Sequence, residues 1–205
     1  MQKYHPLRNC FTGVLILLAP AAYAVDDGFY MGIGAGQSTV YAPGATINGQ
    51  HATAGKSGMG GRIFMGGQFN SHGAFEVGYT HYAAASYNVK SSSGSNPELR
   101  TSAIDFSFHG ILPLAGGFSV FGAPGLALAH ASGSGSLSST GGRGPTSTSV
   151  RPRAGVGVSY DINQSWVADV SMQRLFGSGV IRTSSLLALS ISYHIVDKKC
   201  GEFLC

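Results

Sequence analysis

The stretch Leu187-Ala-Leu-Ser-Ile-Ser-Tyr193 alternates large apolar side chains with Ala or Ser. A period of two is the repeat of a β-strand, whose successive side chains point to opposite faces of a sheet. Similar segments recur through the sequence, and eight can be delimited, at roughly 28–40, 60–70, 74–86, 101–112, 118–131, 149–160, 165–176 and 183–195. The pattern therefore predicts an all-β protein.

The composition excludes several other classes of protein. Of 205 residues, 43% are apolar and only 11% are charged, which is the opposite of the balance in a disordered chain. The 31 glycines keep no period of three and there are only 8 prolines, so the chain is not collagen-like. Gly, Ser and Thr between the apolar alternations also exclude a coiled coil or a helical bundle. The length suits one domain.

The connections between the segments are alternately short and long. Short ones lie at 70–73, 113–117 and 161–164, and long ones at 41–59, 87–100, 132–148 and 177–182. An even number of strands with this alternation is typical of bacterial outer-membrane barrels, whose short turns face the periplasm and whose long loops face outward. We therefore expect an eight-stranded antiparallel up-and-down transmembrane β-barrel, with a soluble periplasmic lipocalin-like barrel as an alternative.

The polar faces of the segments favour the membrane barrel over the soluble one. They consist of Gly, Ser and Ala with one or two charges per strand, whereas a solvated surface would be rich in Lys and Glu. We assign six charged side chains to the barrel interior, three of each sign, and expect them to pair and fill it: Arg62, Glu76, Asp105, Arg151, Arg153 and Asp169. In the fifth segment, Phe118, Phe121, Leu126 and Leu128 do not share one parity, so its faces stay unassigned.

Aromatic residues give a second sign of a membrane. Seven lie at segment ends next to the short turns or the termini: Phe29, Phe69, Phe75, Phe118, Tyr160, Trp166 and Tyr193. Amphipathic rings favour the boundary between membrane and water, so we interpret these residues as one interfacial girdle. The alternative is the general preference of aromatic residues for strands.

The first 24 residues read as a secretory signal peptide. Lys3 and Arg8 precede an apolar run that starts at Phe11, and Ala22-Tyr-Ala24 is a small-x-small cleavage site. Loss of the two basic residues would lower the net charge from +4 to +2. We expect residues 25–195 to form the barrel and 196–205 a tail, in which Cys200 and Cys205 would form a disulfide in an oxidising periplasm. No later segment is apolar for long enough to form a transmembrane helix.

In four of these segments the sequence resembles the OmpA-like and opacity-type family of small eight-stranded outer-membrane barrels. The resemblance spans nearly all of 25–195 and rests on Gly28-Phe-Tyr-Met-Gly-Ile-Gly-Ala-Gly36, Ala74-Phe-Glu-Val-Gly-Tyr79, Gly155-Val-Gly-Val-Ser-Tyr160 and Leu187–Tyr193. It implies location in the bacterial outer membrane. The chain departs from the family in two ways, because no peptidoglycan-binding domain follows and a tail follows the last strand, where family members usually end in an aromatic residue.

The sequence contains one candidate catalytic motif. His130-Ala-Ser132 is similar to the His-x-Ser of lipid A deacylases, barrel enzymes in which a carboxylate orients the His. No Glu lies between Glu98 and Glu202, and Asp169 is assigned to the interior, so we expect a non-enzymatic protein and keep a lipid A-modifying enzyme as the alternative. The histidines show no metal-ligand spacing. We expect no cofactor and no metal.

Basic residues gather at the predicted outer side. Its loops and strand ends carry one acid, Glu98, against six basic residues: Lys56, Lys90, Arg100, Arg143, Arg174 and Arg182. A basic rim at that level faces the phosphates of lipopolysaccharide, and anionic host polysaccharide lies just beyond. The alternative is that long loops simply collect polar and charged residues without binding any ligand, and that interpretation stays open. We expect a monomer that contacts membrane lipids, lipopolysaccharide and anionic ligands, with no role in nucleic-acid binding.

Overall fold

The computed structural model describes residues 28–40, 45–47, 50–55, 57–88, 98–134, 146–178 and 183–196. The predicted signal peptide and both tail cysteines lie outside these residues, as do four of the six predicted rim residues, Lys56, Lys90, Arg143 and Arg182. No helix in the described part of the chain is both long and apolar enough to cross a membrane.

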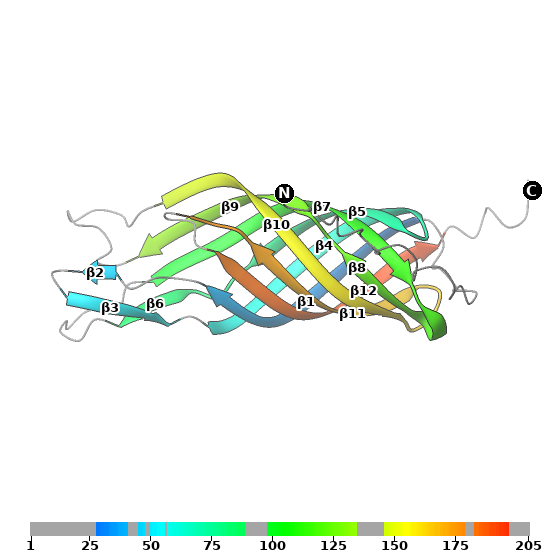
Figure 1. The fold of residues 1–205 in the computed structure, drawn as a ribbon, viewed down its shortest axis with the longest axis horizontal. Coiled ribbons are helices and arrows are strands. Elements are labelled where there is room, and N and C mark those ends of the chain that lie inside the picture. The colour runs from blue at the N-terminus through cyan, green and yellow to red at the C-terminus, as the bar shows by residue number, and fades with distance from the viewer. Residues whose placement is uncertain are drawn as a thin grey trace, which may run out of the picture.

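The molecule is an eight-stranded closed antiparallel β-barrel, as predicted (Figure 1). The wall consists of β1 (Gly28–Val40), β4 (Ser57–Asn70), β5 (Gly73–His81), β7 (Glu98–Pro113), β8 (Phe118–Gly122) followed by β9 (Gly125–Ser134), β10 (Thr146–Asp161), β11 (Trp166–Leu175) and β12 (Ser184–Val196). Each strand pairs with its neighbours in sequence, and β1 pairs with both β4 and β12. Met31, for example, lies opposite Met65 on one side and Tyr193 on the other. The wall therefore has no free edge.

The fifth strand, composed of β8 and β9, keeps one register throughout. Gly122 lies opposite Gly110 and Val156, and the pairing continues in step after Pro124. Pro124 has no N–H to donate, which interrupts the ladder without shifting it. Phe118 and Leu126 point outward, whereas Phe121 points inward and stacks on His109 with 5.2 Å between ring centroids. Phe121 therefore breaks the alternation, because it is the one apolar residue of the four that points inward, and this is why the sequence did not assign the faces of the segment.

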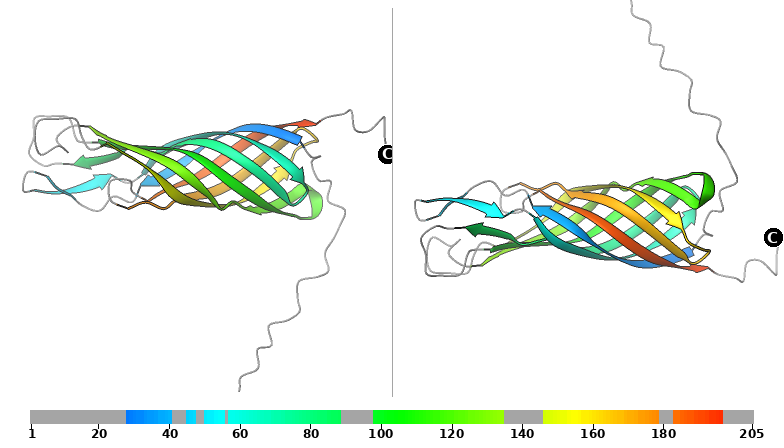
Figure 2. Two further views of the ribbon diagram at one scale, coloured as in Figure 1. Left: turned by 90° about the horizontal axis from the view of Figure 1, so that it is seen from above. Right: turned by 90° about the horizontal axis from the view of Figure 1, so that it is seen from below.

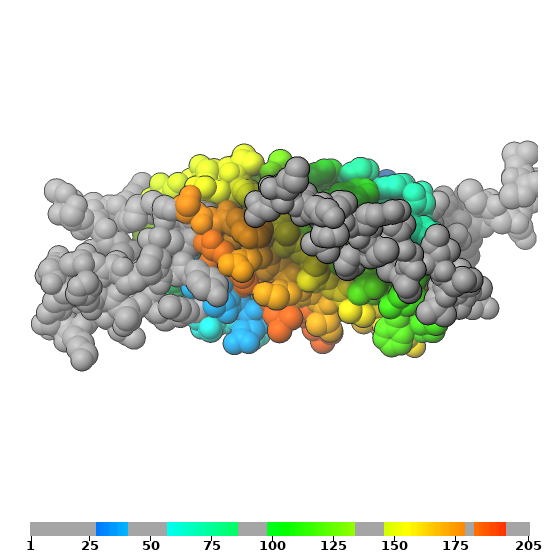
Figure 3. Space-filling view, in the orientation of Figure 1, coloured from blue at the N-terminus to red at the C-terminus, as the bar shows by residue number. Residues whose placement is uncertain are grey.

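The outer face of the wall carries many exposed large apolar side chains, as a membrane-spanning barrel requires. Figure 3 shows this wall from one side. All seven residues predicted as a girdle point outward and are 40–74% exposed. Trp166 packs edge-on against Tyr193 at 5.1 Å between ring centroids, and Phe118 packs against Tyr160 at 4.8 Å. The short turns lie at this end of the barrel (Figure 2), where Asn163 Oδ1 accepts hydrogen bonds from the backbone N–H groups of Ser165 and Trp166. In the turn after β7, Gly116 and Gly117 have φ of +75° and +79°, a conformation that favours glycine.

At the opposite end, three short strands extend the wall beyond the barrel. They are β2 (Ala45–Ile47), β3 (Gln50–Gly55) and β6 (Ala85–Asn88), and β6 joins β3 to β7. The sequence predicted loops there, and it predicted one strand over 74–86, which was wrong. Tyr82 and Ala83 are both buried, which breaks the alternation, and their backbone N–H groups donate to Thr101 O and Ser38 Oγ.

Candidate functional site

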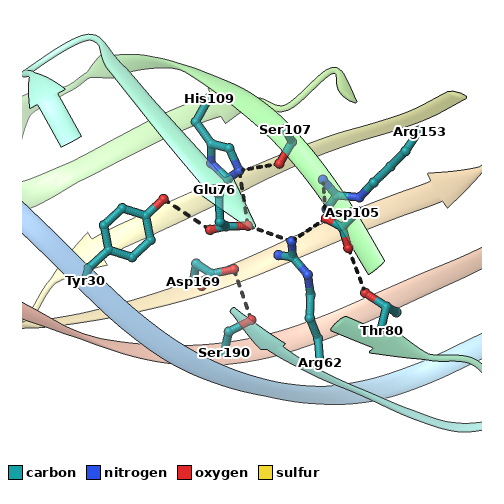
Figure 4. A network of polar contacts seen from close by, with 10 residues as sticks. All are labelled: Tyr30, Arg62, Glu76, Thr80, Asp105, Ser107, His109, Arg153, Asp169 and Ser190. Atoms are coloured by element: carbon teal, nitrogen blue, oxygen red, sulfur yellow. Dashed lines mark hydrogen bonds and ion pairs between the residues drawn. The ribbon is translucent and has the colours of Figure 1, made fainter. Parts of the chain in front are cut away.

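Four charged side chains meet in the middle of the barrel, and we call them the ionic cluster: Arg62, Glu76, Asp105 and Arg153 (Figure 4). They come from β4, β5, β7 and β10, and each is no more than 6% exposed. Strand alternation turns each of them inward, and the register brings them to one level. The cluster contains two charges of each sign, so it is neutral as a unit.

The contacts within the ionic cluster are short. Nη2 of Arg62 lies 2.6 Å from Oε1 of Glu76 and 2.9 Å from Oδ1 of Asp105, and Nη1 of Arg153 lies 3.1 Å from that same Asp105 oxygen. Glycine makes room for the guanidinium of Arg62, because a Cβ at Gly78 would lie 2.6 Å from Nη2. The ionic cluster thus depends on the absence of a side chain at Gly78 on the neighbouring strand β5.

Two hydroxyl groups satisfy the remaining carboxylate oxygens. The hydroxyl of Tyr30 donates to Oε2 of Glu76 at 3.2 Å, and Thr80 donates to Oδ2 of Asp105 at 3.4 Å. Nε2 of His109 lies 3.4 Å from Glu76 Oε1. Buried charges are retained when they are both paired and hydrogen-bonded, and these carboxylates meet both conditions.

The other two predicted interior charges, Asp169 and Arg151, lie outside the ionic cluster. Asp169 points inward from β11 and accepts a hydrogen bond from Ser190 at 3.3 Å, and it forms no ion pair within the described residues. Arg151 is on the inward side of β10 but nearer the long loops. It donates to Ser149 Oγ at 2.9 Å and to Ser178 Oγ at 3.1 Å. The structure therefore brings together four of the six residues.

An apolar layer closes the barrel between the ionic cluster and the long loops. Its members are 0–4% exposed, and small side chains alternate with a few large ones: Val40, Tyr82, Ala85, Leu99, Ala103, Ala127, Ala129, Ala131, Leu175, Leu186 and Ala188. Sequence analysis missed this layer because it treated every inward face as polar. The alternation Ala127-Leu-Ala-His-Ala131 was a usable signal, since those alanines share one face.

A small cavity lies on the other side of the ionic cluster, towards the short turns. Its volume is about 100 Å³. Ser71 and Gly117 line it near the turns, and a stacked pair formed by Tyr30 and His194 lines it deeper inside, with 4.9 Å between ring centroids. This is space for a few water molecules. The interior is thus divided into a cavity, the ionic cluster and the apolar layer.

Polar side chains line the outer wall where the apolar band ends, at the long-loop end. In one outward row, which we call the polar row, His81, Ser102, His130 and Thr148 are in register across β5, β7, β9 and β10. His130 Nδ1 and Thr148 Oγ1 are 2.8 Å apart. Among the described residues, this hydroxyl is the partner of His130, where a deacylase would need a carboxylate. Ser132 lies further along β9, opposite Arg100.

The two rim residues that the structure describes, Arg100 and Arg174, both lie on this outer wall. Arg100 is in the next row beyond the polar row, with its side chain 66% exposed and its Nη2 3.3 Å from Glu98 Oε2. Arg174 is exposed on β11, with its guanidinium carbon 5.7 Å from the centre of the Phe176 ring. No group of three or more His, Cys, Asp or Glu that would hold a metal is found in the described part of the chain.

Comparison with known proteins agrees with this architecture. A protein of Coxiella burnetii, described as uncharacterized, is 29% identical over 181 residues, which cover 74% of this chain and 73% of the relative. Neisserial surface protein A has a similar structure, with a TM-score of 0.60, 21% identity, and coverage of 82% of this chain and 97% of that one. The attachment invasion locus protein Ail of Yersinia pestis, solved in complex with the heparin analogue sucrose octasulfate, gives a TM-score of 0.52 at 15% identity, with coverage of 83% and 99%.

The family comparison covers the whole barrel. The model of the OmpA-like transmembrane domain matches residues 24–197. The outer membrane protein OprG of Pseudomonas aeruginosa shares the fold as well, with a TM-score of 0.53 at 11% identity over 82% of this chain and 97% of that one. The chain therefore belongs to the OmpA-like transmembrane domain family and is a β-barrel of the bacterial outer membrane.

Proposed function

We propose that this barrel is a monomeric, non-enzymatic surface protein whose basic outer wall contacts the phosphates of lipopolysaccharide and other anionic ligands. One observation carries the proposal. The polar row replaces apolar side chains where the membrane-facing band ends, and Arg100 follows in the next row. Outward side chains at that level face lipid headgroups rather than acyl chains.

The distribution of charge supports the choice of an anionic ligand. Arg100 and Arg174 are exposed at this end, and the sequence adds Lys56, Lys90, Arg143 and Arg182 in or near the long loops, against Glu98. Solubility alone does not require one sign of charge, whereas attraction to phosphate or sulfate does. The Ail barrel, which shares the fold, was solved with a sulfated heparin analogue. That complex supports an anionic ligand for this chain too.

The contacts of His130 support a non-enzymatic role. Its Nδ1 is engaged by Thr148, and Asp169 lies on the inner face of the wall, whereas His130 and Ser132 follow the outward positions of β9. A nucleophile, base and carboxylate on opposite sides of a sheet do not form a relay. All eight wall strands find both neighbours within one chain, which supports a monomer.

The test is salt-dependent binding of the refolded full chain to purified lipopolysaccharide and to heparin. Each basic side chain near an anionic surface contributes about 1 kcal/mol, so Arg100→Glu with Arg174→Glu should weaken binding by about tenfold or more. Gln164→Glu adds a carboxylate in an exposed turn at the opposite end and should have no effect. Salt-independent binding, or an unchanged double variant that folds, would refute the proposal.

A further inference from the structure

The girdle has a gap at Gly67 on β4. Gly67 points outward and lies directly opposite Phe29 of β1 and Phe75 of β5, so two aromatic rings flank a residue without a side chain. A Cβ at Gly67 would lie 3.7 Å from the nearest carbon of the Phe29 ring, which is ordinary contact. The missing side chain is therefore not required by packing, and its absence leaves a hollow in the outer wall.

The hollow at Gly67 is part of a groove of about 380 Å³. Its floor is Gly66 and Gly67, and its walls are apolar side chains in two adjacent rows: Phe29, Met31, Met65, Phe75, Val77 and Ile195. These wall side chains are 45–74% exposed. Neighbouring Tyr30 and Glu76 point into the barrel, so no charged side chain of the described residues lies on the groove surface.

The position of the groove identifies its occupant. It lies at the short-turn end, within the apolar band, and the barrel is an outer-membrane protein, so the medium in contact with the groove is the periplasmic leaflet of the bilayer. Its lining offers van der Waals contact and no hydrogen-bonding side chain, which matches a hydrocarbon chain. Met31 and Met65 face each other across the ladder, and unbranched thioether side chains adapt to a flexible ligand.

We propose that this groove holds one acyl chain of a phospholipid from the periplasmic leaflet. Lipid tails are as apolar as the protein wall, so burial from water does not retain the lipid. Retention comes from shape, because a chain in the groove contacts a floor and two walls, whereas a chain on the flat wall contacts one surface. The site therefore selects the hydrocarbon chain and not the headgroup.

Photolabelling of the full chain in phosphatidylethanolamine vesicles tests the proposal. The vesicles contain a trace of the same lipid with a diazirine in its acyl chain. Met65 in the groove and Met172 on β11 have the same chemistry, both point outward, and they are 63% and 50% exposed. We expect Met65 to carry about threefold more label than Met172, or more, because a chain in the groove contacts the protein on three sides and a chain on the flat wall on one. Labelling in proportion to exposure would overturn the proposal.

Filling the groove gives the matched experiment. Gly67→Leu should lower the label at Met65 to the level of Met172 and reduce phospholipid retained in native mass spectrometry. Gly122→Leu adds the same side chain at another outward glycine, where a Cβ would meet no atom within 4 Å, and should change neither readout. If Gly67→Leu does not fold, Gly67→Ala replaces it. Unchanged labelling in the folded variant, or a dimer crosslinked through Met65, would refute lipid occupancy.

Discussion

Arg62 and Arg153 share one acceptor. Their terminal nitrogens lie 2.9 Å and 3.1 Å from the same oxygen of Asp105, and all three side chains are at most 4% exposed. Two buried guanidinium groups repel each other, and the carboxylate between them offsets that repulsion. Asp105 is therefore the residue on which the ionic cluster depends most.

Asp105→Asn should destabilise the barrel strongly. The substitution keeps the shape and removes the charge, which leaves Arg153 without its ion pair. Loss of one partner of a buried pair costs about 3–5 kcal/mol, and this loss should appear in urea unfolding of the protein in lipid vesicles. Glu98→Gln is the control, because its ion pair with Arg100 is exposed and should contribute at most about 1 kcal/mol. Equal effects of the two variants would contradict the prediction.

Gly78→Ala should also destabilise the barrel, although it adds only a methyl group. The new Cβ would lie 2.6 Å from Nη2 of Arg62, so the guanidinium has to leave its position between Glu76 and Asp105. Overpacking of this kind costs about 1–3 kcal/mol. Gly110→Ala is the matched control, because its Cβ would have no neighbour closer than 4.0 Å. A Gly78→Ala variant as stable as Gly110→Ala would show that Arg62 has room to move.

The wild-type barrel should show no large, steady single-channel conductance in planar bilayers. The ionic cluster and the apolar layer each close the interior at a different level. The double variant Tyr82→Ala, Leu186→Ala opens the apolar layer and leaves the ionic cluster intact, so it should remain closed too. Steady conductance of the wild type would refute the closed interior. Conductance of the double variant alone would show that the apolar layer is the only seal.

Lipid A should be the same in cells that express this protein and in cells that lack it. Mass spectrometry of extracted lipid A measures this directly. His130→Ala and Ser132→Ala should likewise leave the spectrum unchanged, because His130 contacts the hydroxyl of Thr148. A lipid A species lacking one acyl chain, dependent on His130, would establish the enzymatic alternative.

Cys200 and Cys205 should form a disulfide that the barrel does not need. They are five positions apart in the sequence after β12, which ends at Val196, and a tail in the periplasm would be in an oxidising compartment. Protein extracted under alkylating conditions should contain no free thiol at either position. A chain that ends at Ile195 should still insert and show heat-modifiable mobility. Two alkylated cysteines would refute the bond, and failed insertion would refute its dispensability.

The sequence predicted the eight strands because alternation is a local property. Leu187, Leu189 and Ile191 reveal an outward face without knowledge of any neighbour. The same reasoning turned Arg62, Glu76, Asp105 and Arg153 inward.

Features that depend on several strands at once were not predictable in this way. Which charges meet depends on strand stagger, so Arg151, two residues from Arg153, contacts Ser178 and not the ionic cluster. Leu175 and Leu186 are apolar residues near strand ends on two different strands, and only the register places them in one layer. The sequence did not predict the groove for the same reason. Gly67 forms a gap only because the register places it between Phe29 and Phe75.

The seam between β1 and β12 has a consequence for biogenesis. Gly28 pairs with Val196 there, so the first and last strands close the barrel by pairing with each other. Contacts with such a large separation in sequence make folding slow, and the seam forms only after the last strand has been exported. Until then β1 and β11 each present an unpaired edge, which is a template for aggregation. A chain truncated before Ser184 lacks β12, so the edges of β1 and β11 stay unpaired. We therefore expect periplasmic chaperones and proteases to act on it before it reaches the membrane.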